Sequence, residues 1–90
     1  MKTEFKKSFL NDVKKLRDKQ IKNQILTVIS VVESAVTISD IPNIKKLKGT
    51  KKNIYFRIKL SEYRIGITIE NEVVTFVVFD KRKDIYKLFP

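Results

Sequence analysis

Three cations lie close together in the segment YFRIKLSEYRIGI, which spans residues 55–67. Its alternating polarity predicts a β-hairpin closed by a two-residue turn. In that register Lys59 lies opposite Arg64, and Arg57 lies two residues away on the same side of the sheet. Like charges that face each other across a sheet destabilise it, so this placement calls for a functional reason. The three side chains predict a positively charged platform for a narrow anion such as a phosphodiester.

A second group of cations comes near the C-terminus, in the sequence DKRKDIYKLF. Lys81, Arg82 and Lys83 follow a predicted strand, so we expect them near the edge of the sheet where the first cluster lies. Tyr86 comes four residues after Arg82, and in a short helical turn these two side chains share one face. This cluster extends the predicted anion site.

A third basic stretch, KKLKGTKK, precedes the hairpin. Pro42 and Gly49 bracket its first part, which favours a loop. Lysines beside a phosphate site typically contact a nucleic-acid backbone and give salt-dependent affinity with little sequence preference. The predicted backbone-contacting residues are Lys45, Lys46, Lys48, Lys51, Lys52, Lys81 and Lys83.

The overall charge points the same way, because the 90 residues include 20 Lys and Arg against 10 Asp and Glu, a net charge of +10. Such an excess attracts polyanions: nucleic acid first, then an acidic protein segment or an anionic membrane surface. The absence of Cys and His excludes a thiol nucleophile, a thiolate metal site and the usual general base. We therefore expect no metal and no cofactor.

No targeting segment is predicted. The N-terminus lacks the apolar core of a signal peptide, and the longest apolar stretch, residues 25–38, contains Glu33 and is too short to cross a bilayer. We therefore expect a cytoplasmic protein without a membrane partner.

The elements that must position these side chains form one predicted domain, residues 1–90, because no linker or repeat divides the chain. A short edge strand is expected over residues 1–6. Ser8 is the predicted N-cap of a first helix that ends near Asp18, and Asp18 is the predicted N-cap of a second helix over Lys19–Val36. Three strands of alternating polarity follow. They are expected over residues 54–60, 63–70 and 73–79.

Two-residue turns at Ser61-Glu62 and Asn71-Glu72 fix the register of these strands. The count predicts Val77 beside Gly66 and Phe79 beside Arg64 on the face that carries the cations, with Gly66 leaving room among them. The predicted fold class is α+β, with two N-terminal helices packed on a twisted antiparallel sheet and a short C-terminal helical turn. The residues predicted to face the helices are Ile54, Phe56, Ile58, Ile65, Ile67, Ile69, Val74, Phe76 and Val78.

The order and spacing of several segments resemble the RelE/ParE superfamily of bacterial toxin–antitoxin toxins. The matching segments are EFKKSFLNDVKKL, KLKG, YFRIKLSEYRIGITIENEVVTFVV and DKRKDIYKLF, which cover nearly the whole chain. YRIG and KRKDIY are most similar to the RelE-type mRNA endonucleases. The resemblance implies two helices on an antiparallel sheet, cleavage of mRNA in the ribosomal A site and a cognate antitoxin. The catalytic residues that it implies are Arg57, Lys59, Arg64, Arg82 and Tyr86, with Arg57 and Lys59 where the best-known RelE pattern has two lysines.

These residue types suggest how such a site cuts RNA without metal or His. The 2′-OH attacks its adjacent phosphate, which gives a 2′,3′-cyclic phosphate and a 5′-OH. Arg57 and Arg64 suit the phosphorane, because guanidinium groups match phosphate oxygens and stay charged. Lys59 and Tyr86 are both candidates for the base. Arg82 is the candidate that steadies the leaving oxygen.

Other functions stay open from the sequence. A ParE-type protein of the same superfamily poisons DNA gyrase without cutting RNA. A non-enzymatic RNA-binding or ribosome-associated module would only hold phosphate, and an inactive relative would pair with an antitoxin and bind DNA only through it. Tyr55 and Phe79 are candidates for stacking a base, with sheet packing as the alternative for Tyr55. The RelE interpretation predicts three partners, namely the antitoxin, mRNA and the ribosome.

Overall fold

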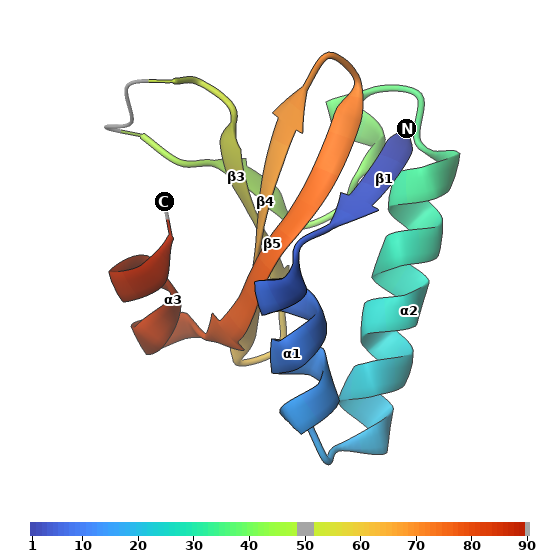
Figure 1. Ribbon diagram of the computed structural model, residues 1–90. Coiled ribbons are helices and arrows are strands. Elements are labelled where there is room, and N and C mark those ends of the chain that lie inside the picture. Colours follow the sequence, from blue (N-terminus) through green and yellow to red (C-terminus); the bar gives the residue numbers. More distant parts are fainter. Residues whose placement is uncertain (49–51, 90) are drawn as a thin grey trace.

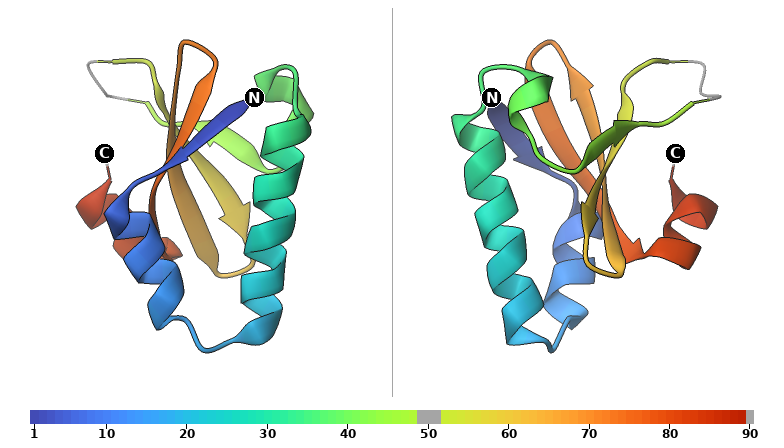
Figure 2. Two further views of the ribbon diagram at one scale, coloured as in Figure 1. Left: turned by 45° about the vertical axis from the view of Figure 1, so that its right-hand side comes forward. Right: turned by 180° about the vertical axis from the view of Figure 1, so that it is seen from behind.

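The fold is a five-stranded sheet in the order β1-β5-β4-β3-β2, with the N-terminal helices on one face and the C-terminal helix on the other (Figure 1; Figure 2). This computed structural model describes residues 1–48 and 52–89. The strands are β1 Lys2–Phe5, β2 Ile44–Lys46, β3 Tyr55–Leu60, β4 Tyr63–Glu70 and β5 Val73–Lys81. The helices are α1 Lys7–Lys15, α2 Lys19–Ser34, the 3-10 turn η1 Ile38–Asp40, and α3 Arg82–Leu88. The predicted α+β class is confirmed.

Two strands differ from the prediction. β1 is the expected edge strand, but it runs parallel to β5, so the sheet is mixed and not wholly antiparallel. Nearly the whole chain separates these two strands, so no tight turn sets their relative direction. β2 lies where a basic loop was expected, and it pairs antiparallel with β3. Ile44 lies opposite Ile58, while Lys45 and Lys46 suit an exposed edge strand.

The two N-terminal helices form as predicted, with one change at the start of α1. The Asp18 carboxylate accepts hydrogen bonds from the backbone of Gln20 and Ile21, which confirms it as the N-cap of α2. Ser8 lies inside α1 and does not cap it, since Lys6 occupies the N-cap without a side-chain hydrogen bond. Among the described residues, no helix combines the length and apolar character needed to span a membrane.

The β3–β4 hairpin has the predicted register. Lys59 lies opposite Arg64, and Arg57 lies opposite Gly66. The residues that alternate with these cations, such as Ile58 and Ile65, are buried in the core shared with α1 and α2. The polar face of this hairpin therefore points away from the N-terminal helices.

The β4–β5 register is confirmed only up to the pairing of Ile67 with Phe76, because a β-bulge then shifts it by one residue. Beyond the bulge, Arg64 lies opposite Asp80 and not opposite Phe79. Phe79 is buried in the helix-side core, and Val78 packs on the other face with α3. The predicted faces of Val78 and Phe79 are therefore wrong.

Two side chains of helix α1 form hydrogen bonds with the backbone of β5 at the bulge. The Ser8 hydroxyl donates to the carbonyl of Val77, and the Asp12 carboxylate accepts a hydrogen bond of 3.0 Å from the backbone N–H of Phe79. Ser8 and Asp12 are one helical turn apart, so they share a face of α1. They satisfy a backbone carbonyl at the bulge and a backbone N–H just after it, where β1 no longer pairs with β5.

Helix α3 docks on the opposite face of the sheet through a small separate core. Val78, Ile85 and Phe89 are buried there, and the Tyr55 ring meets Phe89 edge-on at 5.4 Å between ring centroids. A Cβ atom at Gly66 would lie 2.7 Å from Val78 Cγ2 and 2.8 Å from Phe89 Cδ2. Gly66 therefore makes room for Val78 and for α3, and not for the cations as predicted.

Candidate active site

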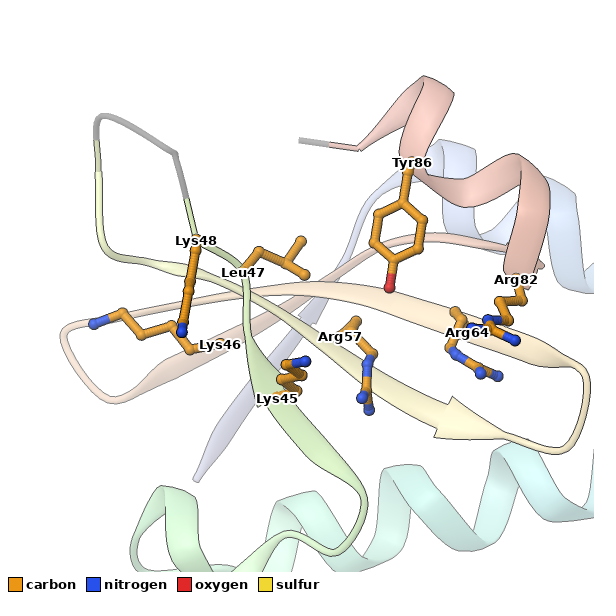
Figure 3. Close-up of a pocket in the computed structure, with 8 residues that line it drawn as sticks. All are labelled: Lys45, Lys46, Leu47, Lys48, Arg57, Arg64, Arg82 and Tyr86. Atoms are coloured by element: carbon orange, nitrogen blue, oxygen red, sulfur yellow. The ribbon is translucent and has the colours of Figure 1, made fainter.

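A basic pocket of about 340 Å³ lies between the β2 edge and α3, over the polar face of β3 and β4 (Figure 3). Among the described residues, eight line it, of which six are Lys or Arg and none is acidic. Such a concentration of positive charge attracts an anion strongly, because none of these described lining residues supplies a carboxylate to neutralise it. The lining residues are Lys45, Lys46, Leu47, Lys48, Arg57, Arg64, Arg82 and Tyr86.

Arg64 is the most deeply placed cation of the pocket, with 7% of its surface exposed. Its Nη1 donates to the carbonyls of Ser61 at 3.0 Å and Tyr63 at 2.8 Å. Asp80 lies across from it in the sheet, but the Asp80 carboxylate accepts from the backbone N–H of Lys81 at 2.7 Å. Within residues 1–48 and 52–89, Arg64 forms no ion pair. In the same part of the chain, no side-chain nitrogen is both buried and without a hydrogen-bond partner. The other guanidinium nitrogens of Arg64 therefore stay accessible to a bound anion.

Arg57 occupies the centre of the pocket. It is half-buried, and its Nη1 donates to the carbonyl of Asn43 at 2.8 Å. Lys45 lies directly opposite Arg57 in the β2–β3 pair, so both side chains are on the same face. Two fixed arginines on adjacent strands suit the recognition of a phosphate, whose oxygens accept paired N–H donors.

Helix α3 brings the C-terminal residues to the same pocket, as the spacing of Arg82 and Tyr86 predicts. The helix begins at Arg82, whose backbone N–H donates to the Glu62 carbonyl at 2.9 Å. Ile85 and Phe89 bury the opposite side of the helix, which leaves Tyr86 54% exposed. The Tyr86 hydroxyl points toward Arg57 and Arg64 (Figure 3).

The structure separates the predicted basic residues into two groups. Lys45, Lys46 and Lys48 line the pocket with Arg57, Arg64 and Arg82. Lys59 is on the same face of the sheet but is exposed and lines a separate small hollow beside Pro42 and Asn43. Three further lysines that were predicted to contact RNA are exposed and do not line the pocket: Lys52, Lys81 and Lys83. The fourth, Lys51, lies outside the described residues.

Two aromatic residues have packing roles. Phe79 is 5% exposed and stacks on Tyr63 at 4.8 Å between ring centroids, so the prediction that it stacks a base is wrong. Tyr55 packs against Phe89, which confirms the sheet-packing alternative. Leu47 was not singled out from the sequence, although it lines the pocket and packs on the small α3 core. The sequence feature that could have indicated Leu47 is its place as a single apolar residue within a basic stretch.

Among the described residues, no group of three or more Asp and Glu side chains is placed to hold a metal ion.

Two comparisons with individual proteins, one by sequence and one by structure, agree on the family. No family model matches the chain. The toxin RelE3 of Methanocaldococcus jannaschii is 34% identical over 91 residues and covers the whole of both chains. The RelB-RelE antitoxin-toxin complex from Methanococcus jannaschii is 32% identical, with a TM-score of 0.78 over 97% of this chain and 99% of that one. The RelE-RelB complex from Pyrococcus horikoshii is 18% identical and has the same fold, with a TM-score of 0.74 over 92% and 96% of the two chains. The protein therefore belongs to the RelE family of toxin–antitoxin toxins.

Proposed function

We propose that this toxin is a ribosome-dependent endoribonuclease that cuts mRNA by attack of the 2′-OH on the adjacent phosphate, without a metal ion. One observation supports this most strongly, namely a pocket whose described lining includes six cations and a tyrosine but no carboxylate. That arrangement fits a phosphodiester whose negative charge increases in the transition state. The sparse set of acid–base groups favours dependence on the ribosome, which would supply further positioning of the mRNA.

In the proposed reaction the 2′-oxygen forms a bond to phosphorus, and the bond from phosphorus to the 5′-oxygen breaks. Arg57 and Arg64 stabilise the phosphorane, because each guanidinium is fixed by a backbone carbonyl and keeps free donors. Arg82 lies at the α3 end of the pocket, where it is the candidate partner of the leaving 5′-oxygen. The leaving 5′-oxygen takes up a proton from solvent, so the products are a 2′,3′-cyclic phosphate and a 5′-OH.

A base must take the proton of the 2′-OH, and the position of Tyr86 favours it over Lys59. The Tyr86 hydroxyl points toward the two arginines, whereas Lys59 does not line the pocket (Figure 3). Lys45, Lys46 and Lys48 extend the positive surface along the β2 edge, where they would contact neighbouring phosphates of the RNA.

The direct test is cleavage of an mRNA by the purified protein, with and without ribosomes. We expect cleavage that depends on ribosomes and resists a chelator, with products that end in a 2′,3′-cyclic phosphate and a 5′-OH. An mRNA with a 2′-O-methyl group at the cleavage position should stay intact. Inhibition of DNA gyrase without cleavage would instead support the ParE-like alternative, and salt-dependent RNA binding without cleavage would support a non-catalytic role.

We also propose that a cognate antitoxin binds the apolar groove between α1, α2 and β1. This groove has a volume of about 550 Å³ and includes Leu10 and Leu26, which are 52% and 64% exposed. Exposed apolar surface of this kind is typical of a docking site for an amphipathic helix. Lys14 and Lys22 also line it, so an acidic helix fits best. Both related complexes described above pair a RelE with a RelB.

A charge placed in this groove should weaken antitoxin binding. Leu26→Glu puts a carboxylate on a surface that the apolar face of the partner would cover, so we expect the Kd to rise by about 30-fold. Isothermal titration with the antitoxin measures this. Val36→Glu is the matched control, because Val36 is 83% exposed and does not line the groove. Equal affinities of the two variants would place the antitoxin elsewhere.

A further inference from the structure

The two central arginines of the pocket share an unusual kind of support. Of the described non-glycine residues, four have a positive φ. Asn71 and Glu72 close the β4–β5 hairpin, with φ of 52° and 65°. The other two, Asn43 with φ of 62° and Ser61 with φ of 55°, each point their carbonyl at a site arginine.

We infer that Asn43 and Ser61 are positioning residues, whose left-handed backbone conformation aims a carbonyl at the guanidinium group of Arg57 or Arg64. The Asn43 carbonyl accepts from Arg57 Nη1 at 2.8 Å and also from the backbone N–H of Lys59 at 3.0 Å. The Ser61 carbonyl accepts from Arg64 Nη1 at 3.0 Å. The meaning of this device for RNA cleavage depends on the function proposed above.

The left-handed conformation decides where each carbonyl points. Pro42 and Asn43 have the residue types of the two central positions of a type II turn, which needs a positive φ at its second central position. Asn tolerates that conformation, whereas a β-branched residue strongly disfavours it. A change of Asn43 to a negative φ rotates the peptide plane, and the carbonyl then turns away from Arg57.

A backbone carbonyl orients an arginine without placing a negative charge beside it. It fixes the guanidinium group by a hydrogen bond but carries no net charge, so Arg57 and Arg64 keep their full positive charge for a phosphate. Asp80 lies across from Arg64 in the sheet, yet its carboxylate accepts from the backbone N–H of Lys81. The two arginines are therefore oriented without being neutralised.

The test compares Asn43→Val and Asn43→Gly, which differ in their tolerance of a positive φ, with a control variant at Asn71. Asn43→Val should weaken binding of a 2′-O-methyl RNA oligonucleotide by about tenfold, because Arg57 loses its orientation. Asn43→Gly permits the positive φ and should restore binding to within about twofold of the parent protein. Asn71→Val is the matched control, since it has the same conformational cost at a turn that supports no site arginine, and its affinity should match the parent. Asn43→Ala replaces Asn43→Val if the latter fails to fold.

A double-mutant cycle with Arg57→Ala shows whether Asn43 acts through Arg57. In that background Asn43→Val should cause no further loss of RNA affinity. A loss as large as in the parent background, or equal weakening by Asn43→Gly and Asn43→Val, would overturn the inference.

The NMR signals of the Arg57 guanidinium group separate this inference from the proposed function. In the absence of RNA, Asn43→Val should shift these signals, and Asn43→Gly should leave them near the parent positions. Unchanged signals in Asn43→Val would overturn the inference even if the parent protein cuts mRNA. Shifted signals in a protein that never cuts mRNA would support the positioning role and contradict only the proposed reaction.

Discussion

Arg64→Ala should reduce mRNA cleavage by about 100-fold or more, because it removes a preorganised donor aimed at the charge of the transition state. Arg64 is 7% exposed, and two carbonyls hold one end of its guanidinium group. A single-turnover cleavage assay on programmed ribosomes measures the loss. Antitoxin binding should stay near the parent value, because the proposed antitoxin groove lies on the other face of the sheet.

Two further variants make this prediction specific. Arg17→Ala removes the same charge from an exposed position outside the pocket, so it should cleave like the parent protein. Arg64→Lys keeps the charge but loses the fork of donors, so it should recover only a small part of the activity. Full activity of Arg64→Lys would show that charge alone matters, as in a protein that only holds phosphate. Full activity of Arg64→Ala would remove this residue from the mechanism.

Gly66→Ala should undock α3 and destabilise the protein by about 1–3 kcal/mol, because the added methyl group overpacks the small core. The new Cβ atom would lie 2.7 Å from Val78 and 2.8 Å from Phe89, closer than side chains tolerate. A loss of stability would be informative, since Gly→Ala at an open position in a strand usually stabilises the folded protein. Cleavage should fall by about 100-fold, because α3 carries Arg82 and Tyr86 into the pocket.

Chemical unfolding and limited proteolysis of the C-terminus test this together with the cleavage assay. Phe89→Ala is the comparison variant, because it also removes the anchor of α3 but introduces no clash. The two variants should share a loss of cleavage and an exposed C-terminus, with the helix-side core still folded. A Gly66→Ala protein that is more stable than the parent and fully active would contradict this account of the α3 core.

The sequence predicted the β3–β4 half of the site well, for a clear physical reason. A two-residue turn and strict alternation leave one register for the hairpin, so Arg57, Lys59 and Arg64 were placed on the correct face. The spacing of Arg82 and Tyr86 likewise predicted the shared face of α3. Short-range geometry was sufficient in both cases.

Longer-range features were not predictable in this way. The bulge in β5 is held by Ser8 and Asp12 from another element, and nothing in the alternation of β5 itself marks it. Counting from the turn therefore placed Phe79 beside Arg64, where Asp80 lies. Lys59 shows a second limit, because being on the right face of a strand does not decide whether a side chain reaches a pocket. The catalytic roles of these residues stay predictions.

The contact of Ser8 and Asp12 with β5 links the beginning of the chain to its end. One extra residue in β5 decides which side of the sheet each later residue meets, and therefore the direction in which the chain enters α3. Substitutions of Ser8 or Asp12 in α1 should therefore change the position of Tyr86, the candidate base, on the other face of the sheet. In this toxin, the hydrogen bonds from α1 to β5 therefore help to set the position of α3.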